Sequence, residues 1–200
     1  MPYSPAIHHR RSIRLKGYDY SQAGLYFVTI CVQNRRCLFG KIENGEMILN
    51  DLGKIIENEW LNLKNKYPQI ELDTFIIMPN HFHAILQIVR PDNTISQIAR
   101  PDNAVSQIAH PDNAVSQIAH PDNVIQKQGR ANPAPTNTTT LGNIIGYFKY
   151  QTTKKIDSPD KLWQRNYYEH IIRNEQAYQN IADYIIHNPA AWQKDKFYAE

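Results

Sequence analysis

Cysteine and long hydrophobic runs are scarce in this chain. Only two cysteines occur, Cys31 and Cys37, and neither belongs to a CxxC pair, so a disulfide framework and a cysteine-based zinc site are both excluded. No apolar stretch approaches the ~18 residues that a membrane-spanning helix requires, which excludes a membrane-spanning protein. The basic N-terminus, residues 1–16, is not followed by the apolar stretch of a signal peptide. We therefore expect a cytoplasmic protein.

The small excess of positive charge in the chain lies near its N-terminus. The formal net charge is +3, and the arm formed by residues 1–20 alone carries four basic residues against one acidic residue. The basic residues are Arg10, Arg11, Arg14 and Lys16. Because tyrosines follow them, the arm is suited to bind the phosphates and bases of DNA. A solvated tail that precedes the first strand is the alternative interpretation.

A ten-residue sequence is repeated almost without change from residue 90. The copies start at Arg90, Arg100, His110 and His120. Their near-identity and low apolar content indicate a recent tandem duplication within a loop, whereas a small solenoid would need a sustained apolar face. We therefore predict an inserted low-complexity loop at 90–140, which interrupts a single domain formed by residues 21–89 and 141–193.

Outside this insertion, the pattern of apolar and turn residues predicts an α+β fold. Asn44-Gly45 is a hairpin turn signal, Pro68 ends a helical pattern, and Asn174 is a helix N-cap. Strands are expected at 25–33, 70–77, 82–89 and 167–173, a hairpin at 39–49, and helices at 52–63, at 141–156 and between Asn174 and Pro189. This order is typical of a ferredoxin-like antiparallel sheet with helices on one face, here with an extra C-terminal helix.

Two histidines open one of the expected strands. Side chains alternate between the faces of a strand, so His81 and His83 project together while Phe82 faces the other way. Two adjacent imidazoles can hold a divalent metal ion, and two unpaired polar rings would be costly to bury in this otherwise apolar run. Histidines that are exposed or hydrogen-bonded remain the alternative to a metal site.

Tyr184 and Asn188 lie four residues apart on the C-terminal helix, at the edge of its apolar stripe. This spacing stacks the two side chains on one face. An interfacial tyrosine and a C-terminal cap asparagine would give the same pattern. A tyrosine hydroxyl is nevertheless a competent nucleophile when a metal polarises the phosphate that it attacks, and an amide oxygen one turn away can supply a third metal ligand.

Three motifs in this order resemble the single-tyrosine HUH transposases, and most closely their branch of REP-associated tyrosine transposases. The motifs are Met78-Pro79-Asn80-His81-Phe82-His83, the segment from Leu162 to Asn174, and Asp183-Tyr184-Ile185-Ile186-His187-Asn188-Pro189. The resemblance covers roughly residues 10–90 and 140–193. Where other proteins of the wider class have glutamine, this chain has Asn188, which presents the same amide oxygen.

The resemblance implies a metal-dependent enzyme that cuts and rejoins single-stranded DNA, often beside a hairpin, as a monomer or a homodimer. His81, His83 and Asn188 would bind Mg²⁺ or Mn²⁺, and Tyr184 would form a 5′-phosphotyrosine. These three ligands are neutral, so the ion would keep its full charge for the phosphate. No ATP would be required, in agreement with the absence of a GxxxxGK[ST] motif. The alternative is a domesticated DNA-hairpin-binding protein without cleavage activity.

Other residues compete for these roles. Tyr147 also has an amide four residues on, at Gln151, and Tyr150 lies beside it, whereas Tyr178 falls on the core stripe and is expected to be structural. Glu169 and His170 lie in the second motif and are candidates to position the metal ligands without binding the metal themselves. A hydrolase of small phosphoesters ranks last, because it predicts a carboxylate-rich cluster near the histidines that the sequence lacks.

Overall fold

The computed structural model describes residues 14–15, 17–89 and 139–198. The basic residues Arg10, Arg11 and Lys16 and the repeats within 90–138 lie outside the described residues, so the predictions on them stay predictions. In chain order the elements are β1 (Gly24–Cys31), the 3-10 helix η1 (Gln33–Arg35), β2 (Gly40–Glu43), β3 (Glu46–Leu49), α1 (Asp51–Leu61), α2 (Leu63–Lys66), β4 (Ile70–Met78), β5 (His81–Ile88), α3 (Leu141–Ile156), β6 (Tyr168–Ile172), α4 (Glu175–His187) and the 3-10 helix η2 (Trp192–Lys194).

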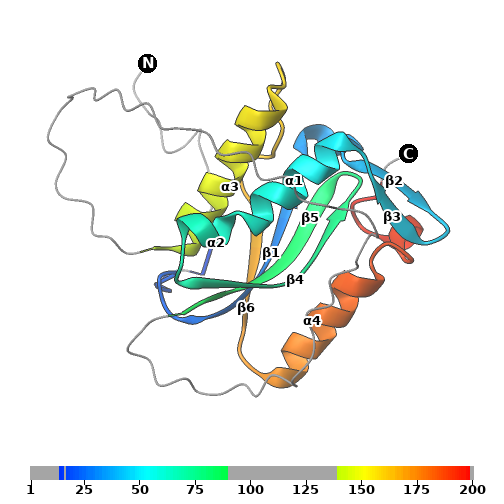
Figure 1. The fold of residues 1–200 in the computed structure, drawn as a ribbon. Helices are drawn as coiled ribbons and strands as arrows, with labels where there is room; N and C mark the ends of the chain where they lie inside the picture. Colours follow the sequence, from blue (N-terminus) through cyan, green and yellow to red (C-terminus); the bar gives the residue numbers. More distant parts are fainter. Residues whose placement is uncertain (1–13, 16, 90–138, 199–200) are drawn as a thin grey trace, which may run out of the picture.

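Four strands form one sheet in the order β4-β5-β1-β6 (Figure 1). Every neighbouring pair is antiparallel. The hairpin of β4 and β5 places β5 beside β1, and the two helical connections return the chain to the same sheet. This is the ferredoxin-like topology, so the predicted fold class is confirmed.

One face of the sheet packs against α1 and α3 and forms the main core. Trp60 on α1 is fully buried, with its ring centroid 4.8 Å from that of Phe82 and 5.3 Å from that of Phe148. Phe82 comes from β5 and Phe148 from α3, so a single indole joins both helices to the sheet. Burial of aromatic side chains on this scale supplies a large part of the hydrophobic stabilisation.

The opposite face of the sheet is covered in part by α4. Buried Ala182 and Ile185 of this helix pack in a second, smaller cluster with Leu25 and Ile85 of the sheet. The N-cap Asn174 accepts a hydrogen bond from the backbone of Ala177 at 2.8 Å, as its position before the apolar stripe predicts. The extra C-terminal helix therefore lies on the other face from α1 and α3, and it contacts β4 and β5.

Local backbone geometry explains where the observed elements differ from the expected ones. The Asn44-Gly45 turn has positive φ at both residues, as a tight hairpin turn requires, and the predicted hairpin is confirmed. The first strand ends at Cys31 rather than residue 33, because Asn34 and Arg35 adopt positive φ in η1. The helix expected at 52–63 is divided at Asn62 into α1 and α2.

The described residues on either side of the segment 90–138 meet at Gln69. Its backbone carbonyl accepts a hydrogen bond from the backbone of Val89 at 2.7 Å. Its side-chain amide donates to the hydroxyl of Thr139. Thr140 then caps α3 by accepting a hydrogen bond from the backbone of Asn143. The last described residue before the insertion and the first one after it are thus held by the same residue.

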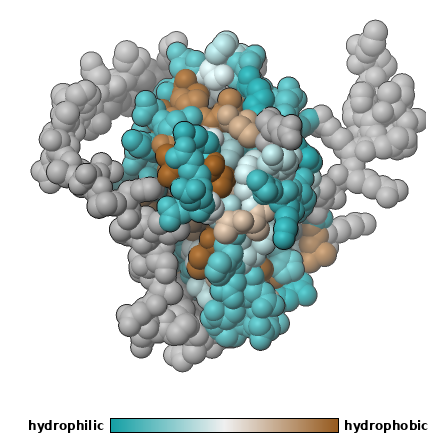
Figure 2. Space-filling model, turned by 90° about the vertical axis from the view of Figure 1, so that its right-hand side faces the viewer, coloured by the Kyte–Doolittle hydropathy of each residue, from teal (hydrophilic) through white to brown (hydrophobic). Residues whose placement is uncertain are grey.

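No helix in the described part of the chain is long and apolar enough to span a bilayer. Figure 2 views the side of the molecule that carries α4 and the β2–β3 hairpin, and this side is mainly hydrophilic with small, separate hydrophobic patches. Separate exposed hydrophobic residues are ordinary on a protein surface.

Candidate metal and tyrosine centre

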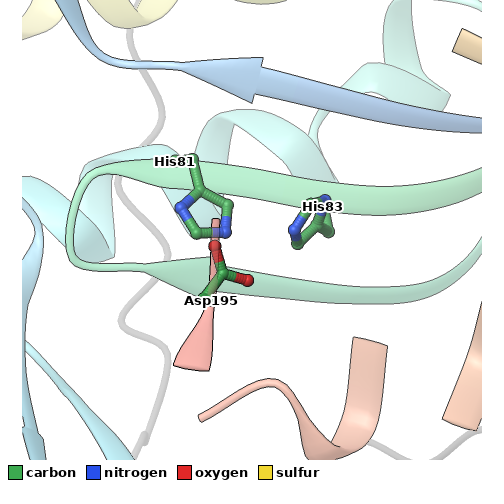
Figure 3. Close-up of side chains that lie close together, drawn as sticks. All are labelled: His81, His83 and Asp195. Carbon is green, nitrogen blue, oxygen red and sulfur yellow. The ribbon is translucent and has the colours of Figure 1, made fainter. Parts of the chain in front are cut away.

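The two histidines of β5 lie side by side on the face of the sheet that carries α4. Their ring centroids are 4.5 Å apart, and both side chains are buried. Phe82 between them points into the core on the other face. The strand alternation therefore predicted their common direction correctly, and Figure 3 shows both rings directed toward the same space.

Neighbouring side chains fix the orientation of each imidazole. Nδ1 of His81 lies 2.8 Å from Oδ1 of Asn80, whose amide nitrogen donates to the carbonyls of Arg35 and Phe197. Because that amide is fixed, its oxygen must accept the proton of Nδ1, and Nε2 of His81 is left with a lone pair. Nδ1 of His83 lies 2.8 Å from Oγ1 of Thr29, and its Nε2 faces α4. Each ring thus presents Nε2 to the same side.

Tyr184 reaches this pair from α4. Its hydroxyl lies 3.2 Å from Nε2 of His83, and its ring packs edge-on against the imidazole. The side chain is 41% exposed, so a polymer substrate can approach its hydroxyl from solvent. The structure therefore brings together Tyr184 and the histidines that the sequence motifs single out.

Asp195 is a fourth member of the centre that the sequence analysis missed. It follows η2, and its Oδ2 accepts hydrogen bonds from Tyr184 at 3.3 Å and from the amide of Asn188 at 3.0 Å. Ligand atoms of His81, His83 and Asp195 all lie within 4.8 Å of one another. Figure 3 shows the carboxylate facing the two rings. These three residues can hold a metal ion.

Asn188 is buried at the end of α4 beside the same space. Its Oδ1 has no hydrogen-bond partner among the described residues, and neither has Nε2 of His81. Burial of two acceptors without a donor lowers the stability of the fold unless a bound group interacts with them. A divalent cation would satisfy both of them, so this donor set of two imidazoles, a carboxylate and an amide oxygen fits a metal ion that accepts nitrogen and oxygen ligands.

The titration behaviour of the centre follows from its burial. Burial lowers the pKa of His81 to about 4, against the smaller opposing effect of the Asp195 carboxylate. Burial and the neighbouring His81 place the pKa of His83 well below its usual value. Both rings are therefore neutral at pH 7, as metal ligands must be. Burial and the Asp195 charge raise the pKa of Tyr184 to about 12, so its hydroxyl is protonated there.

An aromatic residue near the C-terminus closes one side of the centre. Phe197 is buried with its ring centroid 4.7 Å from that of His81, and its backbone donates to Oδ1 of Asp195 at 2.6 Å. Lys196 and Arg35 lie over the Phe197 ring, at 4.7 and 5.6 Å from its centroid. Cationic groups therefore stand at the rim of the site, where a phosphate would approach.

The other candidate residues lie elsewhere. Tyr147 accepts a hydrogen bond from Gln151 at 2.7 Å on α3, on the far face of the sheet. Tyr150 is exposed on the same helix, and Tyr178 is buried against the sheet, where its hydroxyl donates to Asp73. The structure thus separates these competing tyrosines from the histidines.

The residues proposed to contact DNA or support the site are also distributed over both faces. Arg14 donates to the Tyr167 hydroxyl at 2.9 Å and lies over the rings of Tyr20 and Tyr167. In β6, Glu169 pairs in register with Val28 and faces the main core, whereas His170 pairs with Phe27 on the histidine face. Arg14 and Glu169 are therefore not part of the metal and tyrosine centre.

This protein is an α+β protein with a ferredoxin-like antiparallel sheet, and it carries a buried histidine pair and a tyrosine on the helix that packs beside that pair. No protein-family model matches the chain. It is 40% identical over 201 residues to a Haemophilus influenzae protein named as uncharacterized, covering 99% of this chain and 98% of that protein. The chain belongs to one family with this Haemophilus protein.

Two further comparisons confirm the resemblance to REP-associated tyrosine transposases. A second Haemophilus influenzae protein, named "Putative REP-associated tyrosine transposase", is 25% identical over 184 residues, which cover 86% of this chain and 73% of that protein. The solved structure of a REP-associated tyrosine transposase bound to a REP hairpin superposes with a TM-score of 0.54 at 18% identity, covering 90% of this chain and 73% of that one. At this identity the structural likeness shows the fold.

Proposed function

We propose that this protein cleaves and rejoins single-stranded DNA beside a hairpin, through a 5′-phosphotyrosine at Tyr184. The observation that carries the proposal is the Tyr184 hydroxyl, 3.2 Å from Nε2 of a buried histidine and next to a set of metal-ligating atoms. The solved transposase structure is bound to a REP hairpin, which supports a hairpin-bearing nucleic acid as the substrate class.

His81 and His83 would hold the metal through Nε2, with Asp195 or Asn188 supplying an oxygen ligand. A bound Mg²⁺ or Mn²⁺ would act as a Lewis acid on the scissile phosphate. Thr29 and Asn80 orient the rings by binding their Nδ1 atoms, and such supporting hydrogen bonds set both the tautomer and the basicity of a ligand.

Tyr184 must lose its proton as it attacks. With a pKa raised to about 12, the phenol does not ionise by itself at neutral pH, and Oδ2 of Asp195, at 3.3 Å, is placed to accept the proton. In the step, the tyrosine oxygen forms a bond to phosphorus, the bond from phosphorus to the 3′-oxygen breaks, and the 3′-oxygen takes up a proton. The reverse step rejoins the strand, so no other energy source is consumed.

The test is to incubate the protein with hairpin-bearing single strands and Mg²⁺ or Mn²⁺, and to look for a covalent adduct on denaturing gels. Tyr184→Phe keeps the ring and should bind DNA without forming the adduct. Tyr147→Phe and Tyr150→Phe are matched controls on α3 and should react as the wild-type protein does. Adduct formation by Tyr184→Phe would overturn the assignment of the nucleophile.

Hairpin binding without cleavage is the second candidate function. The observation that favours it is Phe197, which packs on His81 and limits access to the histidines. This candidate predicts DNA binding that is independent of metal, with no adduct formed by the wild-type protein under any metal condition.

A further inference from the structure

A cleft of about 410 Å³ lies between α3 and the segment that leads into β6. It is lined in part by Lys149, Tyr150 and Thr153 of α3 and by Lys161, Trp163 and Arg165 of that segment. No acidic side chain is among the described residues that line it. The cleft thus combines aromatic and cationic groups without a compensating negative charge.

The wall of this cleft is held by three hydrogen bonds, of which the one between Trp163 and Thr152 is buried. The ammonium group of Lys149 donates to the backbone carbonyls of Gln164 and Arg165, at 2.6 and 3.1 Å. The indole of Trp163 donates to Oγ1 of Thr152 at 2.8 Å. Because the backbone is held in this way, the binding surface is preorganised, which reduces the entropy lost when a ligand binds.

The groups at the rim of the cleft are free to bind a ligand. Tyr150 is 62% exposed, which is unusual for a large aromatic side chain on a core helix. Lys161 and Arg165 are exposed, and in the described part of the chain neither pairs with a carboxylate, since the nearby Asp160 pairs with Arg36 instead. An exposed aromatic ring beside two unpaired cations is the combination that binds a base together with its phosphate.

The backbone of the segment that lines the cleft reaches the end of β1, one strand away from His81, while α3 packs on the face of the sheet opposite the histidines. The backbone of Gln164 donates to the carbonyl of Cys31 at 2.9 Å, and Cys31 is paired with His81 in the sheet. Two spacings between neighbouring strands, on the order of 10 Å in total, therefore separate Gln164 from His81. One DNA strand is long enough to contact both places.

We propose that this cleft binds one unpaired nucleotide of the DNA strand that the protein cleaves, with the base stacked on Tyr150 and the phosphate held by Lys161 and Arg165. The inference rests on the proposed function, which supplies the DNA strand. It adds a second contact, on the other side of β1 from the scissile phosphate, that fixes where the strand enters.

The experiment measures the affinity for a hairpin with single-stranded flanks, in the Tyr184→Phe background so that no covalent bond forms. Tyr150→Ala should weaken binding about tenfold through the loss of stacking, while Tyr150→Phe should retain the affinity. The double variant Lys161→Gln, Arg165→Gln should reduce the slope of log affinity against log salt by about 0.7, since the loss of one phosphate contact on a single strand changes that slope by about 0.7. Lys54→Gln, an exposed cation on α1, is the control and should leave that slope unchanged.

Two results would overturn the proposal. One is unchanged affinity in Tyr150→Ala together with an unchanged salt slope in the double variant. The other is equal competition by free deoxynucleoside monophosphates and by the oligonucleotide, which would make a free nucleotide the ligand instead of a DNA strand. Thermal melting of each variant verifies that the fold is intact.

Adduct formation separates this inference from the proposed cleavage. If the wild-type protein forms no adduct but the cleft variants lose affinity, the cleft is a DNA site and the proposed chemistry is wrong. If the wild-type protein forms the adduct and the cleft variants bind DNA like their background, only the cleft assignment fails.

Discussion

The side-chain amide of Asn188 donates a hydrogen bond to Oδ2 of Asp195 at 3.0 Å. This contact joins the end of α4 to the segment after η2. It leaves Oδ1 of Asn188 buried, and no group among the described residues donates a hydrogen bond to it. The same carboxylate oxygen accepts from Tyr184. Asn188 thus positions a carboxylate beside the nucleophile proposed here, in addition to offering an oxygen of its own.

Asp195→Asn should bind Mn²⁺ at least about tenfold more weakly than the wild-type protein, because the variant removes the one anionic ligand atom of the set. Asn188→Ala should lose less affinity, and higher metal concentration should restore its activity, since water can replace an amide oxygen. Isothermal titration with Mn²⁺, without DNA, measures both affinities, and adduct formation at increasing Mn²⁺ concentration measures the restored activity. Affinity of Asp195→Asn equal to that of the wild-type protein would exclude the carboxylate as a ligand.

The metal-free protein should lose stability as the pH falls from about 6.5 toward 4. In the unfolded chain a histidine takes up a proton near pH 6.5, whereas burial lowers the pKa of His81 to about 4 in the fold. Between these values the unfolded state binds more protons, so the free energy of unfolding decreases with falling pH, by an amount on the order of 3 kcal/mol for this group.

Urea denaturation in the presence of a chelator, repeated across this pH range, measures that dependence. His81→Gln removes one of the two titrating rings and should flatten the curve. A curve for the variant that coincides with the wild-type curve would contradict the assignment to His81.

Arg14→Gln should lower the free energy of unfolding by about 1 kcal/mol, because it removes a hydrogen bond to Tyr167 and contacts with two aromatic rings. Urea denaturation measures this change.

Arg10→Gln and Arg11→Gln should each reduce the slope of log affinity for DNA against log salt by about 0.7 and weaken binding to all sequences alike. Binding titrations at several salt concentrations measure this slope. Loss of binding to one DNA sequence alone would mean that these arginines contact bases.

Replacement of residues 90–138 by a short Gly-Ser linker should leave a single cooperative unfolding transition. Val89 and Thr139 both bind Gln69, so a short connection can join them without moving a strand or a helix. Circular dichroism during thermal unfolding tests this expectation. A product that is unfolded or aggregated would show that the insertion contributes to the fold.

Patterns that depend on neighbouring residues were predictable from the sequence. The alternation of a strand placed His81 and His83 on one face, and the spacing of four on a helix placed Tyr184 near Asn188. Asn174 before an apolar stripe predicted the start of α4. Each of these rests on a local backbone period, which the chain carries within a few residues.

Contacts between distant segments were not predictable in the same way. Asp195 belongs to no motif, and only the return of the chain after α4 brings its carboxylate to the histidines. Arg14 is one of several basic residues in the arm, and nothing in its sequence neighbours indicates that it binds Tyr167. Such positions depend on packing across the whole fold, so a single sequence without a known structure gives no signal for them.

The contacts of Val89 and Thr139 with Gln69 also bear on how the gene can change. Nearly identical tandem repeats are prone to gain or lose whole copies during replication. Because the closure cost of a chain segment grows only with the logarithm of its length, one ten-residue copy more or fewer changes that cost by roughly 0.2 kcal/mol. Variants of this gene that differ in copy number should therefore encode proteins with the same ferredoxin-like fold and nearly the same stability.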